Sequence, residues 1–124
     1  MAETLHVEKN VLGGELRACS YAPVTGYFRD GCCATHEQAG VAHLVCVKAS
    51  ERFLAYSKAR GNDLSTPRPE LRFKGLLPGD RWCLHVLRWV EAFEAGEAPP
   101  VVLEATNASA LRYVSLEALK ANAA

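Results

Sequence analysis

An apolar stripe through residues 81–95 predicts the main core helix of this chain. Its large apolar residues recur at i, i+4, i+7 and i+11, which places them on one face of a helix: Trp82, Val86, Trp89 and Phe93. Asp80 can cap the start of this helix at Arg81, and Gly96 can end it after Ala95 in the left-handed conformation. The rest of the fold must therefore cover this face.

Two apolar segments predict strands. Residues 41–47 carry β-branched side chains on one face and apolar side chains on the other, as expected for a central strand that is covered on both sides. Residues 101–105 follow Pro99 and Pro100, which bar any continuation of the core helix. We interpret this second segment as another strand of a small sheet.

Serine residues mark the starts of two further helices. Ser50 can cap a helix that runs from residue 51 to about residue 60, and Gly61 can end it in the left-handed conformation. Ser115 can cap a final helix through Lys120, and residues 107–112 have the pattern of a short helical turn.

The order of these elements predicts an α+β fold, with a small β-sheet and helices packed on one face. Glycine and proline punctuate residues 11–40 every few positions, so turns and short extended pieces are expected there. At this length we expect residues 1–124 to form a single compact domain, with residues 1–9 as a candidate disordered end.

The formal net charge is zero, which argues against binding to nucleic acid or to an anionic membrane. The charges are unevenly distributed, however, because residues 52–81 carry seven basic residues against three acidic ones. This surplus falls on the long loop between the two central helices, residues 57–83, and it suits a small anionic ligand or an acidic partner. A solvated loop of mixed charge is the alternative interpretation.

A ligand site is predicted between this loop, the turn at residues 30–33 and the start of the core helix. Arg60 could bind a carboxylate or phosphate through two hydrogen bonds, and Arg81 lies near the helix N-terminus, where anions are favoured. The polar loop residues could instead cap turns by bonding their own backbone. The candidate ligand-binding residues are Arg60, Asn62, Asp63, Ser65, Thr66, Asp80, Arg81, Asp30 and Cys33.

The chain has five cysteines. Residues 1–10 contain no apolar run of the kind found in a signal peptide, and no stretch reaches transmembrane length, so we expect a cytoplasmic protein whose thiols are mostly reduced. Cys83, at the third position of the predicted core helix, is a candidate nucleophile because free N–H groups there favour a thiolate. Packing as a small apolar side chain is the alternative.

Tetrahedral zinc is a second hypothesis for the cysteines. Four residues could supply the ligands: Cys33, His36, Cys83 and His85. On a helix, however, Cys83 and His85 would point about 200° apart around the axis. We therefore predict no cofactor, and keep these four as candidate metal ligands only.

Four motifs carry a resemblance to a known family. They are Arg29–Cys33, Lys58–Pro67, Gly75–Cys83 and Ala98–Thr106. In this order they resemble the bacterial family of uncharacterised small proteins catalogued as domain of unknown function 2237, over a stretch from about residue 10 to residue 120. The resemblance implies a compact α+β fold and assigns no activity. The chain departs from the family pattern at His85, where the family often has cysteine, and at Asn107, where it often has histidine.

Three functions are consistent with the sequence. The first is a domain that binds a small polar or anionic ligand at residues 58–83 and the start of the core helix. The second is a protein-interaction or structural module without catalysis, and the third is a cysteine-dependent enzyme that uses Cys83. Whether the chain is an enzyme, and its oligomeric state, are left open by these patterns.

Overall fold

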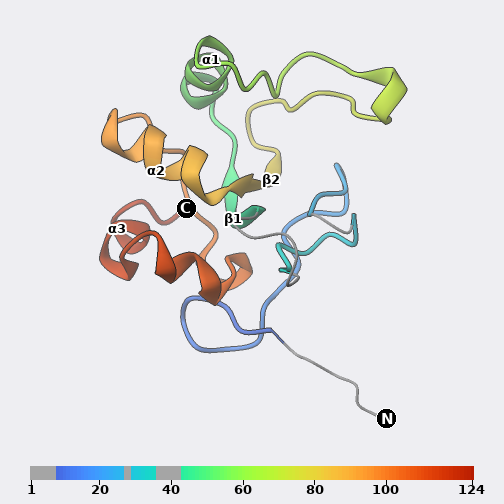
Figure 1. Ribbon diagram of the computed structural model, residues 1–124. Helices are drawn as coiled ribbons and strands as arrows, with labels where there is room; N and C mark the ends of the chain where they lie inside the picture. Colours follow the sequence, from blue (N-terminus) through green and yellow to red (C-terminus); the bar gives the residue numbers. More distant parts are fainter. Residues whose placement is uncertain (1–7, 27–28, 36–42) are drawn as a thin grey trace.

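The computed structural model describes residues 8–26, 29–35 and 43–124 (Figure 1). Its elements follow in the order β1 (His43–Lys48), α1 (Glu51–Ala59), η2 (Pro69–Leu71), β2 (Arg81–His85), α2 (Val86–Glu94), η3 (Leu103–Ala105), η4 (Ala108–Arg112) and α3 (Leu116–Ala121), where η denotes a 3-10 helix. A two-stranded antiparallel sheet with three α-helices in these residues is an α+β fold, as predicted. Residues 1–7, His36 and the predicted strand start at Val41 lie outside the described residues.

The two strands lie at the centre of the molecule, between the helices and the N-terminal segment (Figure 1). In their antiparallel register Cys46 is opposite Cys83, and Val47 is opposite Trp82. Because successive side chains point to opposite faces of a strand, these two pairs face opposite sides. Val47 and Trp82 belong to the main hydrophobic core, whereas the two cysteines belong to a second buried cluster. The prediction that β1 is covered on both sides is therefore confirmed.

The core helix begins at Val86, so the prediction that it starts at Arg81 is wrong. Trp82, Cys83 and Leu84 are consecutive buried residues, which a strand covered on both faces accommodates and a helix with a single apolar face does not. The backbone N–H of Cys83 donates to the hydroxyl of Thr25 at 2.9 Å, on the side of β2 away from β1. Asp80 is consequently a turn residue and not a helix cap.

The predicted strand at residues 101–105 is only partly present. Val101 forms isolated bridges with Val47 and Ala123, so the start of this segment runs along the other edge of β1. It then turns into η3. The physical reason lies in Thr106, whose hydroxyl accepts from the N–H of Cys46 at 3.1 Å and donates to the carbonyl of Val102 at 2.9 Å. The side chain of Thr106 thus pairs with the backbone of β1 at the position where a longer neighbouring strand would have done so.

The capping predictions for the other helices are confirmed. The hydroxyl of Ser50 accepts from the N–H of Phe53, and that of Ser115 accepts from the N–H of Ala118. Gly61, just after α1, has a φ of +91°, a left-handed conformation that glycine adopts without a steric penalty. Among the described residues, no helix is long and apolar enough to cross a membrane.

Trp89 is at the centre of the main core. It is fully buried, and its indole N–H donates to the carbonyl of Pro99 at 3.2 Å. Val86 and Ala92 on the same side of α2 are also fully buried. Phe93 stacks on Trp89 with ring centroids 5.2 Å apart, but it lies at the edge of the core and is 40% exposed. The predicted stripe is therefore correct at its centre and less buried at its end.

Four of the five cysteines form disulfide bonds, which differs from the expectation of mostly reduced thiols. Cys19 is bonded to Cys46 and Cys33 to Cys83, while Cys32 is free. Cys46 and Cys83 face the same side of the hairpin, and the N-terminal segment brings the other two cysteines onto that side. This convergence depends on the folded path of an irregular segment, which composition does not reveal.

We expect Trp89→Ala to lower the free energy of unfolding by about 3–5 kcal/mol, because it removes a fully buried indole and leaves a cavity in the core. Urea denaturation followed by circular dichroism measures this loss. Phe93→Ala, at the exposed edge of the same helix, is the control and should cost less than half as much. Equal losses in the two variants would contradict this assignment of the core.

Candidate functional site

An open groove of about 530 Å³ lies between the hairpin, the segment after α1 and the first turns of α2. This volume falls within the range of small-molecule sites, roughly 300–1,000 Å³. The polar residues of the groove are His43, Asn62, His85, Arg88 and Glu91. Its apolar wall is formed by Leu64, Trp82, Leu84 and Leu87. An apolar wall with a few polar groups at one side is the usual arrangement of a ligand site.

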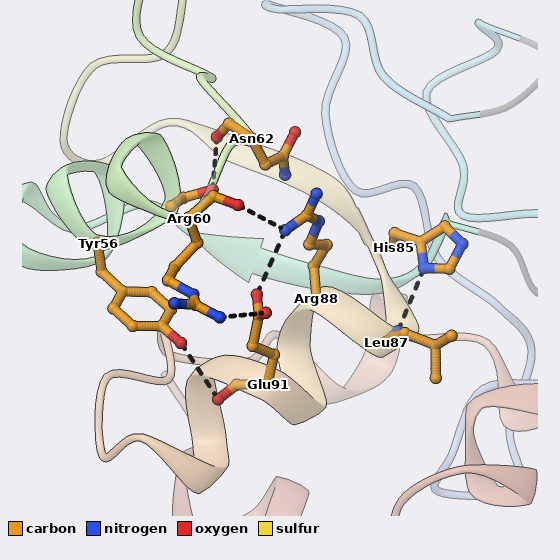
Figure 2. A network of polar contacts seen from close by, with 8 residues as sticks. Tyr56, Arg60, Asn62, His85, Leu87, Arg88 and Glu91 are labelled. Atoms are coloured by element: carbon orange, nitrogen blue, oxygen red, sulfur yellow. Dashed lines mark hydrogen bonds and ion pairs between the residues drawn. The ribbon is translucent and has the colours of Figure 1, made fainter.

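Arg88 supplies the positive charge of the groove, and Figure 2 shows how it is held. Its Nη1 atom donates to the backbone carbonyl of Arg60 at 3.2 Å and lies 3.4 Å from Oε1 of Glu91. Within the described part of the chain, the other guanidinium nitrogens have no protein partner. Since a guanidinium carries five N–H donors in a fixed plane, Arg88 retains donors for a ligand.

Glu91 is shared between two arginines. Its Oε2 atom lies 3.7 Å from Nη2 of Arg60, while Oε1 faces Arg88 (Figure 2). Two guanidinium groups around one carboxylate leave a local surplus of positive charge. The side chains of these pairs are 35–58% exposed, and such ion pairs contribute only about 0–1 kcal/mol each. An incoming anion can therefore compete with Glu91 for Arg88 at little cost.

Asn62 is positioned by its backbone. Its N–H donates to the carbonyl of Ser57 at 2.9 Å, and its carbonyl accepts from the hydroxyl of Ser57 at 2.6 Å. Ser57 is a buried residue of α1, so this double contact anchors the chain where it leaves the helix. The side-chain amide of Asn62 lines the groove and makes no hydrogen bond within residues 8–26, 29–35 and 43–124. It is thus available to a ligand.

Two histidines line the groove near the junction of β2 with α2. The Nδ1 atom of His85 accepts from the N–H of Leu87 at 3.2 Å and so caps α2. The His43 ring meets the His85 ring edge-on, with centroids 5.3 Å apart. Desolvation lowers the pKa of His43 below its ordinary value, and the charges of His85 and Arg29 lower it further. His43 is therefore a neutral imidazole near pH 7.

Trp82 is a buried part of the apolar wall that contacts with neighbouring side chains hold in place. It is 8% exposed, and its ring packs against Phe73 with centroids 5.3 Å apart. The guanidinium carbon of Arg29 lies 5.6 Å from the centre of the indole ring, within the range of a cation–π contact. Contacts with two separate loops hold the indole in place, so the groove has a fixed wall.

The structure brings only part of the predicted ligand site together. Asn62 lines the groove, and Arg60 lies behind it, where its carbonyl and guanidinium hold Arg88 and Glu91 (Figure 2). Arg81 is an exposed residue at the start of β2, and the carboxylate of Asp80 accepts from the N–H of Leu77 at 2.9 Å. The predicted helix N-terminus beside these two residues is therefore absent.

Asp63, Ser65 and Thr66 form a turn of their own. Oδ1 of Asp63 accepts from the N–H groups of Ser65 and Thr66, at 3.0 and 3.1 Å. The hydroxyl of Thr66 donates to Oδ2 of the same carboxylate, and this hydrogen bond is the main reason that the pKa of Asp63 is lowered. In this structure Ser65 and Thr66 both donate to Asp63, as in the alternative interpretation of turn capping.

The cysteine candidates lie on the opposite side of the hairpin. Cys83 is 1% exposed and bonded to Cys33, so it carries no free thiol in this structure. Of the other candidate zinc ligands, His85 caps α2 through Nδ1, and His36 lies outside the described residues. Asp30 accepts from the N–H of Cys32 at 3.0 Å in the neighbouring turn.

The free cysteine, Cys32, is a poor nucleophile. Burial raises the pKa of its thiol, and the carboxylates of Asp30 and Glu8 raise it further. The protonated thiol is therefore the form present near neutral pH. The charged groups that act on Cys32 among the described residues, Asp30 and Glu8, disfavour its thiolate.

The ligand site predicted from the sequence did not include His43, Arg88 or Glu91. Arg88 and Glu91 are three residues apart and flank the apolar stripe of α2, a spacing that puts both side chains on one side of the helix. That spacing was a usable signal. His43 had no such signal, because its place in the groove depends on the pairing of β1 with β2.

The protein is thus a small α+β protein with an open, arginine-containing groove beside its hairpin. Its chain matches the family model DUF2237, described as "Uncharacterized protein conserved in bacteria", over residues 9–123, and it belongs to this family. The predicted resemblance is confirmed. A comparison with curated proteins found no match.

The lowered pKa of His43 predicts a specific dependence of stability on pH. As the pH falls toward the ordinary histidine pKa of 6.5, His43 takes up a proton in the unfolded chain, whereas in the folded chain it does so only at lower pH. Acidification therefore favours unfolding until the pH reaches the lower pKa of the folded state. We expect the wild type to lose more stability than His43→Asn between about pH 7.5 and about pH 5. Urea denaturation at both pH values measures the difference. Identical losses in the two proteins would contradict the assignment.

Proposed function

We propose that this protein binds a small organic anion, a carboxylate or a phosphate ester with an apolar body, in the groove beside α2. The observation that carries the proposal is the guanidinium of Arg88, which is held by one nitrogen and retains its other donors. A planar guanidinium suits the two oxygens of a carboxylate or phosphate. The ligand would displace Glu91 from part of its contact with Arg88.

The neighbouring groups support the same class of ligand. The amide of Asn62 can donate to an oxygen of the anion, and neutral His43 can donate or accept. Trp82, Leu64 and Leu87 offer an apolar surface to the remainder of the ligand. Inorganic anions lack such a body, so we expect them to bind more weakly than aliphatic or aromatic carboxylates of similar charge.

Thermal unfolding in the presence of anions tests this proposal. A ligand that binds only the folded state must raise the melting temperature by mass action. We expect millimolar aliphatic dicarboxylates, aromatic carboxylates or phosphate esters to raise the melting temperature of the wild type, and to raise that of Arg88→Lys much less. Lysine keeps the charge but loses the planar pair of donors.

Arg52→Lys is the matched control. Arg52 is an exposed residue of α1 that pairs with Glu97, and it does not line the groove. It should respond to anions as the wild type does. Because some salts stabilise proteins by exclusion from their surface, only a rise that Arg88→Lys loses counts as binding. A panel in which every anion affects all three proteins equally would refute the proposal.

A further inference from the structure

Four cysteines meet in one buried volume on the side of the hairpin away from α2. Cys19, Cys33, Cys46 and Cys83 are each at most 3% exposed. The sulfur atoms of Cys19, Cys33 and Cys46 all lie within 4.8 Å of one another, and the sulfur of Cys83 is 2.05 Å from that of Cys33. The two disulfides are therefore in contact, sulfur against sulfur.

This spacing is close to that of a metal site. Zinc binds thiolates at about 2.3 Å in tetrahedral geometry, which separates the sulfur atoms by about 3.8 Å. The sulfur of Cys33 lies within 4.8 Å of both sulfurs of the Cys19–Cys46 bond. On reduction, the two bonded pairs, 2.02 and 2.05 Å apart, must open to this separation, and the sulfur of Cys83, which is not within 4.8 Å of all three others, must turn toward them. A site of four sulfurs is typical of zinc or iron, and soft thiolates exclude magnesium and calcium.

We propose that, when its two disulfides are reduced, the protein binds one zinc ion through Cys19, Cys33, Cys46 and Cys83. This set differs from the four candidate ligands considered from the sequence, because Cys19 and Cys46 take the places of the two histidines. The four residues come from three parts of the fold: the N-terminal segment, β1 and β2. The ion would therefore join the same segments that the disulfides join.

The chemistry balances with a dithiol as reductant. Each protein disulfide accepts two electrons and two protons from one dithiol, which becomes a cyclic disulfide, and two protein thiols result. Zinc then replaces the protons of all four thiols, which are released to solvent, and the site carries a net charge of minus two. Dioxygen can oxidise the thiolates back to disulfides: it takes two electrons for each S–S bond formed and is reduced to hydrogen peroxide with two protons from solvent, and the loss of the ligands releases the metal. The disulfide form and the zinc form exclude each other.

A path to the site and a compensating charge lie beside it. A hollow of about 180 Å³ is lined by Gly26, Arg29, His43, Trp82 and Cys83, so it reaches from the surface to one of the four cysteines. Arg29 is an exposed residue whose guanidinium lies against Trp82. Its positive charge would offset part of the charge of a zinc tetrathiolate.

Metal binding by the full chain tests the proposal. Protein reduced with a dithiol, desalted without oxygen and incubated with excess Zn²⁺ should retain one zinc per chain after a second desalting step, measured by elemental analysis. Air-oxidised protein should retain none. With Co²⁺ as a spectroscopic probe, reduced protein should develop thiolate-to-cobalt charge-transfer absorption and the strong visible bands of tetrahedral cobalt. Absence of stoichiometric metal in the reduced protein would overturn the proposal.

Two variants identify the ligands. Cys19→Ser should lose stoichiometric zinc, whereas Cys32→Ser, the neighbouring free cysteine, should retain it. Loss in Cys32→Ser with retention in Cys19→Ser would overturn the assignment. Because Cys19→Ser could fail to fold, the reduced wild type provides a second measurement. A chelator should lower the melting temperature of its zinc form and leave that of the oxidised form unchanged, and an unchanged zinc form would also contradict the proposal.

Discussion

The pairing of Cys46 with Cys83 across the hairpin is the contact on which the rest of the structure depends. It places two thiols on one face of a sheet that has only two strands. Each is bonded to a cysteine of the N-terminal segment and not to its cross-strand neighbour. A two-stranded hairpin is marginal by itself, and an irregular segment has no regular backbone pairing. The two disulfides attach the N-terminal segment to the hairpin, and they reduce the conformational freedom of the unfolded chain.

Side chains complete the same attachment. The amide of Asn107 donates to the carbonyl of Cys33 at 3.0 Å and to the carboxylate of Glu8 at 2.8 Å, while its oxygen accepts from the N–H of Ser109 at 2.9 Å. Asn107 is almost fully buried. With the N-terminal segment fixed on one face, α1 and α2 cover the other, and the groove forms where β2 passes directly into α2.

Local signals predicted much of the fold. Serine caps, left-handed glycines and the apolar stripe identified α1, α3 and most of α2, because each depends on residues within a few positions of one another. The start of α2 was not predictable in this way. Trp82 and Val86 fit a helical spacing equally well, and only the pairing of Arg81–His85 with β1 decides that the first of them lies on a strand.

The candidate site was harder to predict than the fold. Asn62 was identified by residue type, whereas His85 was considered only as a metal ligand, and the other groove residues come from distant parts of the chain. Arg60 was assigned to a ligand, whereas its carbonyl and guanidinium position Arg88 and Glu91. The cysteines were expected to be reduced because the protein was expected to be cytoplasmic. Their disulfide pairing depends instead on the folded path of residues 19–33. Convergence of this kind is a property of tertiary structure.

Mapping the disulfides by mass spectrometry tests this account most directly. The protein is oxidised in air, alkylated at acidic pH to prevent exchange, and digested without reduction. The account predicts linked peptides that join Cys19 to Cys46 and Cys33 to Cys83, with the alkyl group on Cys32. A bond between Cys46 and Cys83, or a bonded Cys32, would contradict it.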